Sequence, residues 1–277
     1  MSDESSNNAR PLVSVITAVL NGESFLEECI RSVRIQAGVT CEHILIDGGS
    51  TDGTLGIARR HADHFSYWSS EPDRGISDAM NKGIARARGE WLLFLQADDY
   101  LLAQDSLADC AKLLKRSVAG VVAFPVRFGM DRSRTLKPHL GGPWINLKLG
   151  ISHQGCFFRR EVFDRLGGYD VQLRICMDYD FCLRAWRAGT RFENAAGPPA
   201  TFMRATGISS RRDWKSLQRR LTEEHAVHLR HARGGLSRFS YDVYWPVYMA
   251  YRWSRFQLSS TFLRARNPYR QLGTGAR

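Results

Sequence analysis

The feature that most limits the possible folds is a regular alternation of strand-like and helix-like segments over the first hundred residues. Apolar runs rich in β-branched and aromatic residues occur at 12–20, 42–47, 65–68 and 90–95. Helical spacing lies between them, as in Leu26, Ile30 and Val33, and the last of these helices is expected to begin with Ser77 as its cap. Such alternation predicts an α/β fold whose central sheet is mostly parallel, with right-handed crossovers.

Polar side chains follow three of these strands at the point where each strand ends. Asn21 comes after the first strand, Asp47 closes the second, and Asp98 and Asp99 follow the fourth. In open parallel sheets, ligands bind beyond the carboxyl ends of the strands, so we expect these residues to face one crevice. An isolated Asp-Asp pair is usually a solvated turn, but carboxylates crowded into a cleft favour a hard divalent cation, Mg²⁺ or Mn²⁺, with positions open for phosphate oxygens.

The glycine-rich segments exclude two common nucleotide sites. The first loop lacks GxGxxG, and "GGSTDGT" (48–54) does not match the P-loop pattern GxxxxGK[ST]. A diphosphate would therefore be held chiefly through the metal ion, which points away from NAD- and ATP-dependent enzymes. A nucleotidyltransferase, which also uses aspartate-bound metal, is disfavoured because no glycine-rich loop carrying Arg or Lys occupies the first turn.

Composition indicates a cytosolic protein. The six cysteines are scattered without a CxxC pair, which argues against a zinc site or a disulfide framework and for reduced thiols. Residues 1–10 are polar and are expected to be a disordered lead-in without the apolar core of a signal peptide. No apolar run is long enough to predict a membrane-spanning helix.

The positive charge is concentrated at the C-terminal end. Residues 207–277 carry 14 Lys and Arg against four acidic residues, a net +10 of the chain's total of +11. We therefore predict a domain at 11–205 and a basic extension at 206–277. The extension should hold one helix over 214–232, ended by Gly234 and Gly235, and a second that begins near Pro246.

Arginines and aromatic residues alternate along this extension, with Trp245 and Trp253 among them. This combination favours a helix lying on an anionic membrane surface. The alternative is that the aromatic residues dock on the domain at 11–205 or on a second subunit, so a homodimer is also possible. Nucleic acid is not the expected partner.

Four segments in the same order and at similar spacing carry a resemblance to a known family. They are "VSVITAVLNGESFLEECIRSVRIQ", "HILIDGGSTDGT", "EPDRGISDAMNKGIARARGEWLLFLQADD" and "GGYDVQLRICMDYDFCLRAWRAG". Over about residues 11–205 the chain resembles a family-2 glycosyltransferase of the GT-A fold, in particular the bacterial enzymes of polysaccharide and lipopolysaccharide synthesis. The resemblance implies a nucleotide-binding βαβ half, a mixed and mostly parallel central sheet, and here a C-terminal helical extension.

The resemblance also implies roles for residues on the donor side. Asp99 corresponds to the direct metal ligand, and Asp98 to a ligand of the metal or the ribose. Thr17 and Asn21 would line the nucleoside pocket, with Asp47 contacting the base or ribose. The usual "VDDGS" is "IDGGS" here, so Gly48 stands where a second aspartate often contacts uracil, and a uridine donor is not implied.

The acidic pair in "ICMDYDFCLRAW" offers a general base. An Asp at a helix N-terminus is also an ordinary cap, so the residues alone leave both interpretations open. The family pattern is usually "EDYD" or "ADYD" with its first Asp as the base, which corresponds to Asp178, whereas Asp180 is expected to be structural. Met177 replaces the frequent Glu. In an inverting transfer this base takes the proton of the acceptor hydroxyl.

Further polar residues receive weaker assignments. The resembling enzymes place the segment that contains Asp73, Asp78 and Lys82 near the diphosphate and sugar, although Lys82 could equally lie on a solvated helix face. The counterpart of the segment around His153 and Gln154 shapes the acceptor side, whereas a lone histidine is more often a structural group.

These inferences lead to one expected function and one competitor. The expected function is transfer of a sugar, with inversion and with Mn²⁺ or Mg²⁺, from a nucleotide-sugar donor to a hydroxyl of a lipid-linked saccharide acceptor. The expected location is cytoplasmic, at the inner face of the cytoplasmic membrane. The competitor is a non-catalytic basic adaptor that binds membranes or polyanions through the extension.

Overall fold

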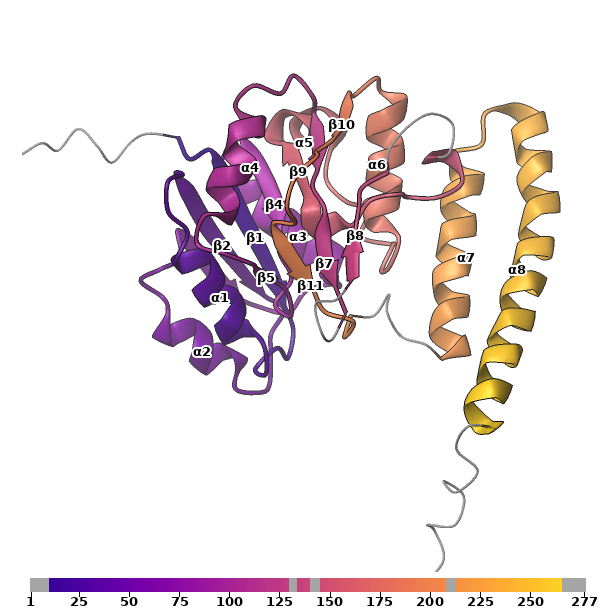
Figure 1. The fold of residues 1–277 in the computed structure, drawn as a ribbon, viewed down its shortest axis with the longest axis horizontal. Coiled ribbons are helices and arrows are strands. Elements are labelled where there is room, and N and C mark those ends of the chain that lie inside the picture. The colour runs from indigo at the N-terminus through magenta and orange to yellow at the C-terminus, as the bar shows by residue number, and fades with distance from the viewer. Residues whose placement is uncertain (1–9, 130–133, 140–144, 208–212, 266–277) are drawn as a thin grey trace, which may run out of the picture. The chain divides into compact units, whose positions relative to one another are not determined.

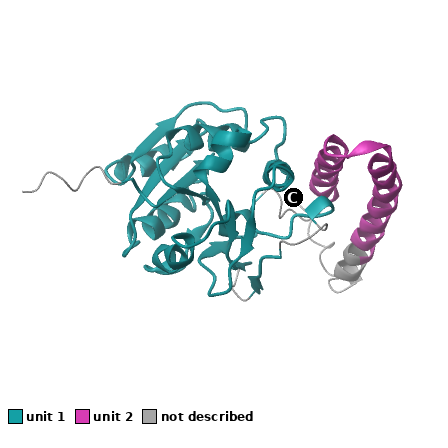
Figure 2. Ribbon diagram, turned by 90° about the horizontal axis from the view of Figure 1, so that it is seen from above, with its two compact units in different colours: residues 1–210 teal, residues 211–277 magenta. Residues whose placement is uncertain are grey.

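The structure is a computed structural model that describes residues 10–129, 134–139, 145–207 and 213–265. It divides into two compact units, residues 1–210 (unit 1) and 211–277 (unit 2), which Figure 2 distinguishes by colour. The expectation of a disordered lead-in falls, apart from Arg10, outside the described residues. The elements of unit 1 are β1 (Val13–Val19), α1 (Leu26–Arg34), β2 (Cys41–Asp47), α2 (Thr54–Arg60), β3 (Tyr67–Ser70), α3 (Ile76–Arg86), β4 (Trp91–Phe94), β5 (Tyr100–Leu101), α4 (Ser106–Leu114), β6 (Val121–Ala123), β7 (Val126–Phe128), β8 (Arg134–Leu136), β9 (Cys156–Arg159), α5 (Arg160–Leu166), α6 (Met177–Arg187), β10 (Phe192–Asn194) and β11 (Thr201–Met203).

A seven-stranded sheet forms the centre of unit 1, in the order β10-β6-β9-β4-β1-β2-β3. Its strands β9, β4, β1 and β2 are labelled in Figure 1. β1 pairs in parallel with both β2 and β4, and β2 pairs in parallel with β3. β9 is antiparallel to its neighbours β4 and β6. Every residue of β1 and β4 is buried, as expected for sheet strands covered on both faces. The prediction of an α/β fold with a mixed, mostly parallel sheet is confirmed.

The helix α3 differs in detail from its prediction. It begins at Ile76 after Gly75, whose φ of 119° favours glycine, so the expected cap at Ser77 is wrong. Ser77 instead lies in the first turn, and its hydroxyl donates to the backbone oxygen of Leu173 at 2.6 Å. This contact joins α3 to a segment almost a hundred residues later in the chain.

A second, four-stranded sheet in the order β5-β11-β7-β8 lies in the same unit. β11 pairs antiparallel to β5 and parallel to β7. Since β5 follows directly on Asp98 and Asp99, this pairing brings the end of β11 beside the acidic pair.

Unit 2 consists of two helices, α7 (Trp214–Arg230) and α8 (Gly234–Ala265). The first agrees with its prediction, but a second helix starting near Pro246 is wrong, because α8 begins twelve residues earlier and Pro246 lies inside it. Gly234, with φ of 80°, makes the turn that reverses the chain. Nowhere in the described ranges is a helix both long and apolar enough to cross a membrane.

Candidate active site

A pocket of about 270 Å³ opens where β4, β11 and α6 come together. Asp98 and Asp99 line it after β4, and Asp178 lines it from the first turn of α6. His153 and Gln154, from a short 3₁₀ helix before β9, complete the set. The structure therefore brings together five residues that the sequence analysis singled out separately.

Asp99 is almost fully buried, at 2% exposure. Its Oδ1 accepts a hydrogen bond from the backbone N–H of Arg204 at 3.0 Å, and the Gln154 side chain also bonds to it. Burial, and next the charge of Asp98, raise the pKa of Asp99 well above its usual range, and the two hydrogen bonds offset only part of this effect. A cation beside this carboxylate would relieve both effects.

The segment after β11 was missed by the sequence analysis. The hydroxyl of Thr206 donates to Oδ2 of Asp98, while the backbone of Arg204 holds Asp99. The Arg204 side chain forms an ion pair with Glu28 and packs over the ring of Phe25. The usable signal was the strand-like "TFM" followed by polar residues, the same pattern that marked the ends of β1, β2 and β4.

The residues at this corner fit a hard divalent cation. Asp98 and Asp99 supply carboxylate oxygens and Gln154 an amide oxygen, the donor set that Mg²⁺ and Mn²⁺ prefer. Among the described residues, no cluster of three or more His, Cys, Asp or Glu could hold a metal ion by itself. Two carboxylates therefore have to be supplemented by other oxygens, as in sites where the remaining ligands are water and phosphate.

Asp178 is partly buried at the N-terminus of α6. Burial raises its pKa to about 6, although its carboxylate accepts a hydrogen bond from the Tyr179 N–H at 2.7 Å. A carboxyl group with this pKa is ionised near neutral pH and is more basic than an ordinary aspartate. These are the properties of a general base.

Asp180 has the structural environment that was expected for it. It is 1% exposed and accepts from Nε of Arg184 at 2.9 Å. The same guanidinium donates to the backbone oxygens of Leu166 and Gly168. Through Arg184, the buried Asp180 carboxylate therefore ties α6 to the residues at the end of α5, while Asp178 lines the pocket.

His153 is held in an aromatic cluster. Its ring stacks on Phe94 with centroids 5.0 Å apart, and Nε2 lies 2.8 Å from the hydroxyl of Tyr169. Burial lowers the pKa of His153 to about 4, so the ring is neutral at physiological pH. Gln154 points to Asp99, which is nearer the predicted metal than its assignment to the acceptor side implied. The acceptor-side roles of both residues stay predictions.

The predicted nucleoside residues form a separate group. Asp47 is fully buried and accepts from the hydroxyls of Ser50 and Ser70 at 2.5 and 2.6 Å. The Asn21 N–H donates to that same Ser50 hydroxyl at 2.7 Å. Thr17 is also fully buried, with its hydroxyl 3.0 Å from Nε2 of His43. None of the three predicted residues lines the pocket that holds Asp178, so their contact with a nucleoside stays a prediction.

The structure explains why position 48 is a glycine. A Cβ at this position would lie 2.3 Å from Oδ2 of Asp73, so the Asp73 carboxylate occupies the space that a side chain at 48 would need. The other oxygen of Asp73 accepts from the Gly75 N–H at 2.7 Å. An aspartate cannot stand at 48 while Asp73 keeps this position.

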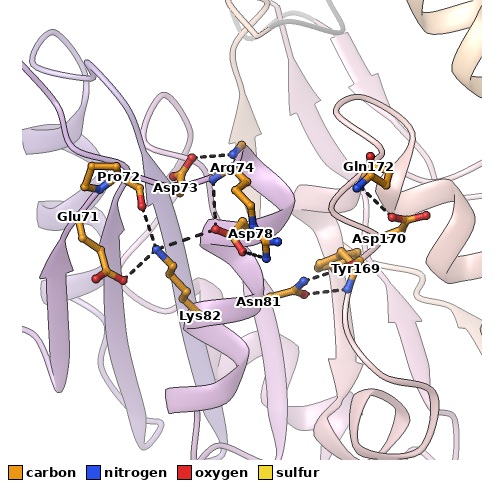
Figure 3. A network of polar contacts seen from close by, with 11 residues as sticks. Glu71, Pro72, Asp73, Arg74, Asp78, Asn81, Lys82, Tyr169, Asp170 and Gln172 are labelled. Atoms are coloured by element: carbon orange, nitrogen blue, oxygen red, sulfur yellow. Dashed lines mark hydrogen bonds and ion pairs between the residues drawn. The ribbon is translucent and has the colours of Figure 1, made fainter.

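Asp78 and Lys82 belong to a network of ion pairs on α3 (Figure 3). Asp78 bonds to Arg74 at 3.0 Å, and Lys82 bonds to Glu71 at 2.8 Å. Since Lys82 is engaged with a carboxylate, it would have to exchange that partner to reach a diphosphate. The donor contacts of Asp78 and Lys82 stay predictions.

Two contacts from α3 support the segment that leads to Asp178. Asn81 bonds to the backbone of Tyr169 twice, at 2.9 Å to its oxygen and at 2.8 Å from its nitrogen (Figure 3). Gly168 lets α3 and the loop before α6 approach closely, because a Cβ at position 168 would lie 2.3 Å from Oδ1 of Asn81. With the Ser77 contact to Leu173, these bonds fix the loop before α6, and the sequence alone gave no sign of them.

Known structures define the class of the fold. The chain superposes on S. aureus TarS 1-349 in complex with UDP-GlcNAc with a TM-score of 0.63 and 19% identity, covering 83% of this chain and 69% of TarS. It also superposes on the mannosyltransferase PcManGT of Pyrobaculum calidifontis, solved with GDP-Man and Mn²⁺, with a TM-score of 0.63 and 20% identity over 98% and 77% of the two chains. The fold is that of the GT-A glycosyltransferases.

Sequence comparison gives the family. The family model described as glycosyl transferase family 2 matches residues 14–168. The Mycobacterium tuberculosis protein named uncharacterized glycosyltransferase MT1564 is 39% identical over 183 residues, 63% of this chain and 69% of its own length. A PGL/p-HBAD biosynthesis glycosyltransferase of Mycobacterium bovis is 35% identical over 185 residues, 64% and 71% of the two chains. The chain belongs to glycosyltransferase family 2, as the resemblance predicted.

Proposed function

We propose that the protein is a metal-dependent inverting glycosyltransferase that moves a sugar from a nucleotide-sugar donor to a hydroxyl group of an acceptor. The observation that carries this proposal is that Asp98, Asp99 and Asp178 line one pocket although they come from distant parts of the chain. An acidic pair on one side and a single carboxylate of raised pKa on the other are what a single in-line displacement requires.

Asp178 is the proposed general base. In the transfer it accepts the proton of the acceptor hydroxyl as the oxygen of that group attacks the anomeric carbon, while the bond to the diphosphate breaks on the opposite face. Its pKa of about 6 lets it be ionised at neutral pH and still bind the proton as the reaction proceeds.

Asp98 and Asp99 are the proposed ligands of Mn²⁺ or Mg²⁺. When bound, such an ion neutralises charge on the leaving diphosphate as a Lewis acid. Thr206 and the backbone of Arg204 keep the two carboxylates in place, and Gln154 orients Asp99. On the donor side we propose that Asn21, Asp47 and Thr17 shape the nucleoside site.

A nucleotide-sugar donor is supported by the neighbours that share the fold, since TarS is bound to UDP-GlcNAc and PcManGT to GDP-Man. Asp73, Asp78 and Lys82 are proposed to lie on the diphosphate and sugar side, where α3 begins. The base of the nucleotide is left open, because Gly48 removes a carboxylate that the family often has and Asp73 takes its space.

The acceptor is proposed to be a lipid-linked saccharide of cell-surface polysaccharide or lipopolysaccharide synthesis. A relative named PGL/p-HBAD biosynthesis glycosyltransferase supports a role in a biosynthetic pathway in general. His153 and Gln154 are the proposed acceptor-side residues. Unit 2, with its net charge of +10 over residues 207–277, is proposed to hold the enzyme at the inner, anionic face of the cytoplasmic membrane.

The proposal is tested by a thermal-shift screen of nucleotide sugars with and without Mn²⁺. A donor at about 100 times its dissociation constant should raise the free energy of unfolding by about 2.7 kcal/mol. The shift should require Mn²⁺ and should disappear in Asp99→Asn. A chain that no nucleotide sugar stabilises, with or without metal, would contradict the proposal.

Turnover separates the enzyme from a non-catalytic adaptor. Donor hydrolysis or transfer should require Mn²⁺ or Mg²⁺ and collapse in Asp178→Asn, while nucleotide binding by that variant stays near that of the wild type. Normal cellular function of folded Asp178→Asn and Asp99→Asn variants would favour the adaptor instead.

A further inference from the structure

Two opposite faces of α8 carry apolar side chains, and only one of these faces packs against α7. The packed face contains Tyr241 and Trp245, which are 8% and 2% exposed, and is called the inner seam below. Trp245 donates from Nε1 to Nδ1 of His228 at 3.0 Å, and the ring of Tyr241 stacks on His228 with centroids 4.8 Å apart. These contacts hold α8 to α7.

The opposite face carries a row of exposed apolar side chains, here the outer stripe. Its members are Leu236, Phe239, Val243, Val247, Tyr251 and Leu258, each between 50% and 85% exposed. They are three, four, four, four and seven residues apart, which places them on one side of a helix. Most of the exposed large apolar side chains of the described residues thus lie on this one helix.

The sequence analysis treated the aromatic residues of the extension as one group, and the structure separates them. Trp245 and Tyr241 stabilise the hairpin, so they are not available to a partner. Three members of the outer stripe, Val243, Val247 and Tyr251, line a shallow hollow of about 460 Å³ together with Tyr244 and Tyr248. A continuous apolar face of this kind normally marks an interaction surface.

The net positive charge of unit 2 distinguishes between the possible partners of the outer stripe. Residues 211–277 hold 14 Lys and Arg against four acidic residues, and Asp242 is the one acidic residue of residues 234–265. A second copy would bring two strongly positive surfaces together, whereas an anionic lipid surface is complementary to them. Nucleic acid would match the charge but would leave the apolar row without contacts.

The polar ends of the aromatic side chains agree with an interface between lipid and water. Arg252 donates to the hydroxyl of Tyr248 at 2.9 Å, and Arg255 donates to that of Tyr251 at 3.2 Å. Tyrosine paired with arginine at the border of an apolar face suits the headgroup region. α8 has 32 residues, and its exposed face is apolar along most of that length, as in a helix that lies in the membrane plane.

We propose that the outer stripe of α8 is the surface that enters the bilayer, with the helix lying flat in the headgroup region of a membrane containing anionic lipid. This refines the membrane placement in the proposed function and rests on it. The inner seam has no contact with lipid, and the arginines supply the attraction to anionic headgroups.

The test is co-sedimentation of the full chain with vesicles of phosphatidylcholine alone and of phosphatidylcholine with phosphatidylglycerol. Binding should be stronger to the anionic vesicles. The variant Val243→Gln/Val247→Gln should bind them at least tenfold more weakly with an unchanged melting temperature. Ile35→Gln/Val118→Gln is the matched control, because these two side chains in unit 1 are 53% and 74% exposed and the pair in α8 is 53% and 67% exposed. Its binding should equal that of the wild type.

Three outcomes would overturn the proposal: no wild-type binding to anionic vesicles, undiminished binding by the stripe variant, or a wild-type dimer that the stripe variant converts to a monomer without any vesicle binding. Should the first variant melt lower, Leu236→Gln/Phe239→Gln at the start of α8 decides. Hydrolysis of a water-soluble donor is measured on the same samples. Its absence together with stripe-dependent binding would refute the proposed activity and leave the membrane surface standing.

Discussion

Asp99 and Asp178 are carboxyl groups in one pocket with different surroundings. Burial raises the pKa of both, but Asp99 also has Asp98 beside it and receives hydrogen bonds from Arg204 and Gln154. Asp178 accepts a bond from the adjacent Tyr179 N–H. The like charge beside Asp99 suits this carboxylate to a cation, whereas burial alone raises the pKa of Asp178 and suits it to a proton.

The pH dependence of the reaction should report Asp178. Below pH 6 its carboxyl is protonated and cannot accept the proton of the acceptor, so kcat/KM should rise about tenfold per pH unit and level off above about 6. The measurement is kcat/KM for the acceptor from pH 5 to 8 at saturating Mn²⁺. A profile that is flat over this range would rule out Asp178 as the base.

Asp178→Asn should be inactive without being less stable. Loss of the base should lower kcat by about 10²–10⁴. Because the folded pKa lies above the unfolded value of about 3.9, ionisation favours the unfolded state, and this carboxyl destabilises the fold increasingly as the pH rises from about 4 to 6. The variant should therefore melt no lower than the wild type at pH 7.5 by calorimetry. A clearly lower melting temperature would show that the carboxylate is structural.

The sequence identified the chemistry of these residues better than their environment. Adjacent aspartates after an apolar strand, and an acidic pair before a helix, can be recognised without a structure. The hydrogen bonds from Arg204 and Gln154 to Asp99 could not, because they join positions 105 and 55 residues apart. Burial of Asp47 and Thr17 was missed for the same reason, since their partners Ser70 and His43 lie 23 and 26 residues further along the chain.

At the scale of elements, long periodic segments were predicted well. β1, β2 and β4 lie where the apolar runs are, and α7 has the expected bounds to within two residues. The three-residue strands β6 to β8 are too short to show a period, and no element was predicted there. The start of α8 was placed too late because Pro246 was taken as a boundary, whereas the helix carries it on an exposed side.

Gly168→Ala should damage the site through α3. The new Cβ would lie 2.3 Å from Oδ1 of Asn81 and would push the loop before α6 away, at a cost of about 1–3 kcal/mol in the free energy of unfolding. We expect a lower melting temperature and a lower kcat with metal binding intact. Gly56→Ala in α2 is the control, because the nearest atom is a flexible Arg60 nitrogen at 3.9 Å. Equal behaviour of the two variants would contradict a role for the close contact between Gly168 and Asn81 in holding this loop.

For the whole molecule, the division of charge and the division of structure nearly coincide. The predicted boundary near residue 205 lies five residues before the limit of unit 1. Every residue that lines the pocket belongs to unit 1, and the excess positive charge belongs to unit 2. The proposed active site and the proposed membrane-binding surface therefore lie in different units of the chain.

A chain that ends at residue 210 should keep metal-stimulated donor hydrolysis and lose vesicle binding. The reason is that unit 1 contains the pocket and its own buried hydrophobic clusters, whereas the outer stripe lies in unit 2. Hydrolysis of a soluble donor and circular dichroism measure the first property, and co-sedimentation measures the second. A truncated chain that folds but hydrolyses nothing would show that unit 2 takes part in catalysis.

The bonds from α3 to the loop before α6 have a consequence for enzyme kinetics. One rigid helix begins at the acidic segment around Asp78 and also holds Tyr169 and Leu173. If the donor binds beside Asp78 as proposed, any displacement of this helix would reach the segment that carries Asp178 through these hydrogen bonds. The Michaelis constants of the two substrates should consequently not be independent, and an enzyme evolved for a new donor will need its acceptor kinetics measured afresh.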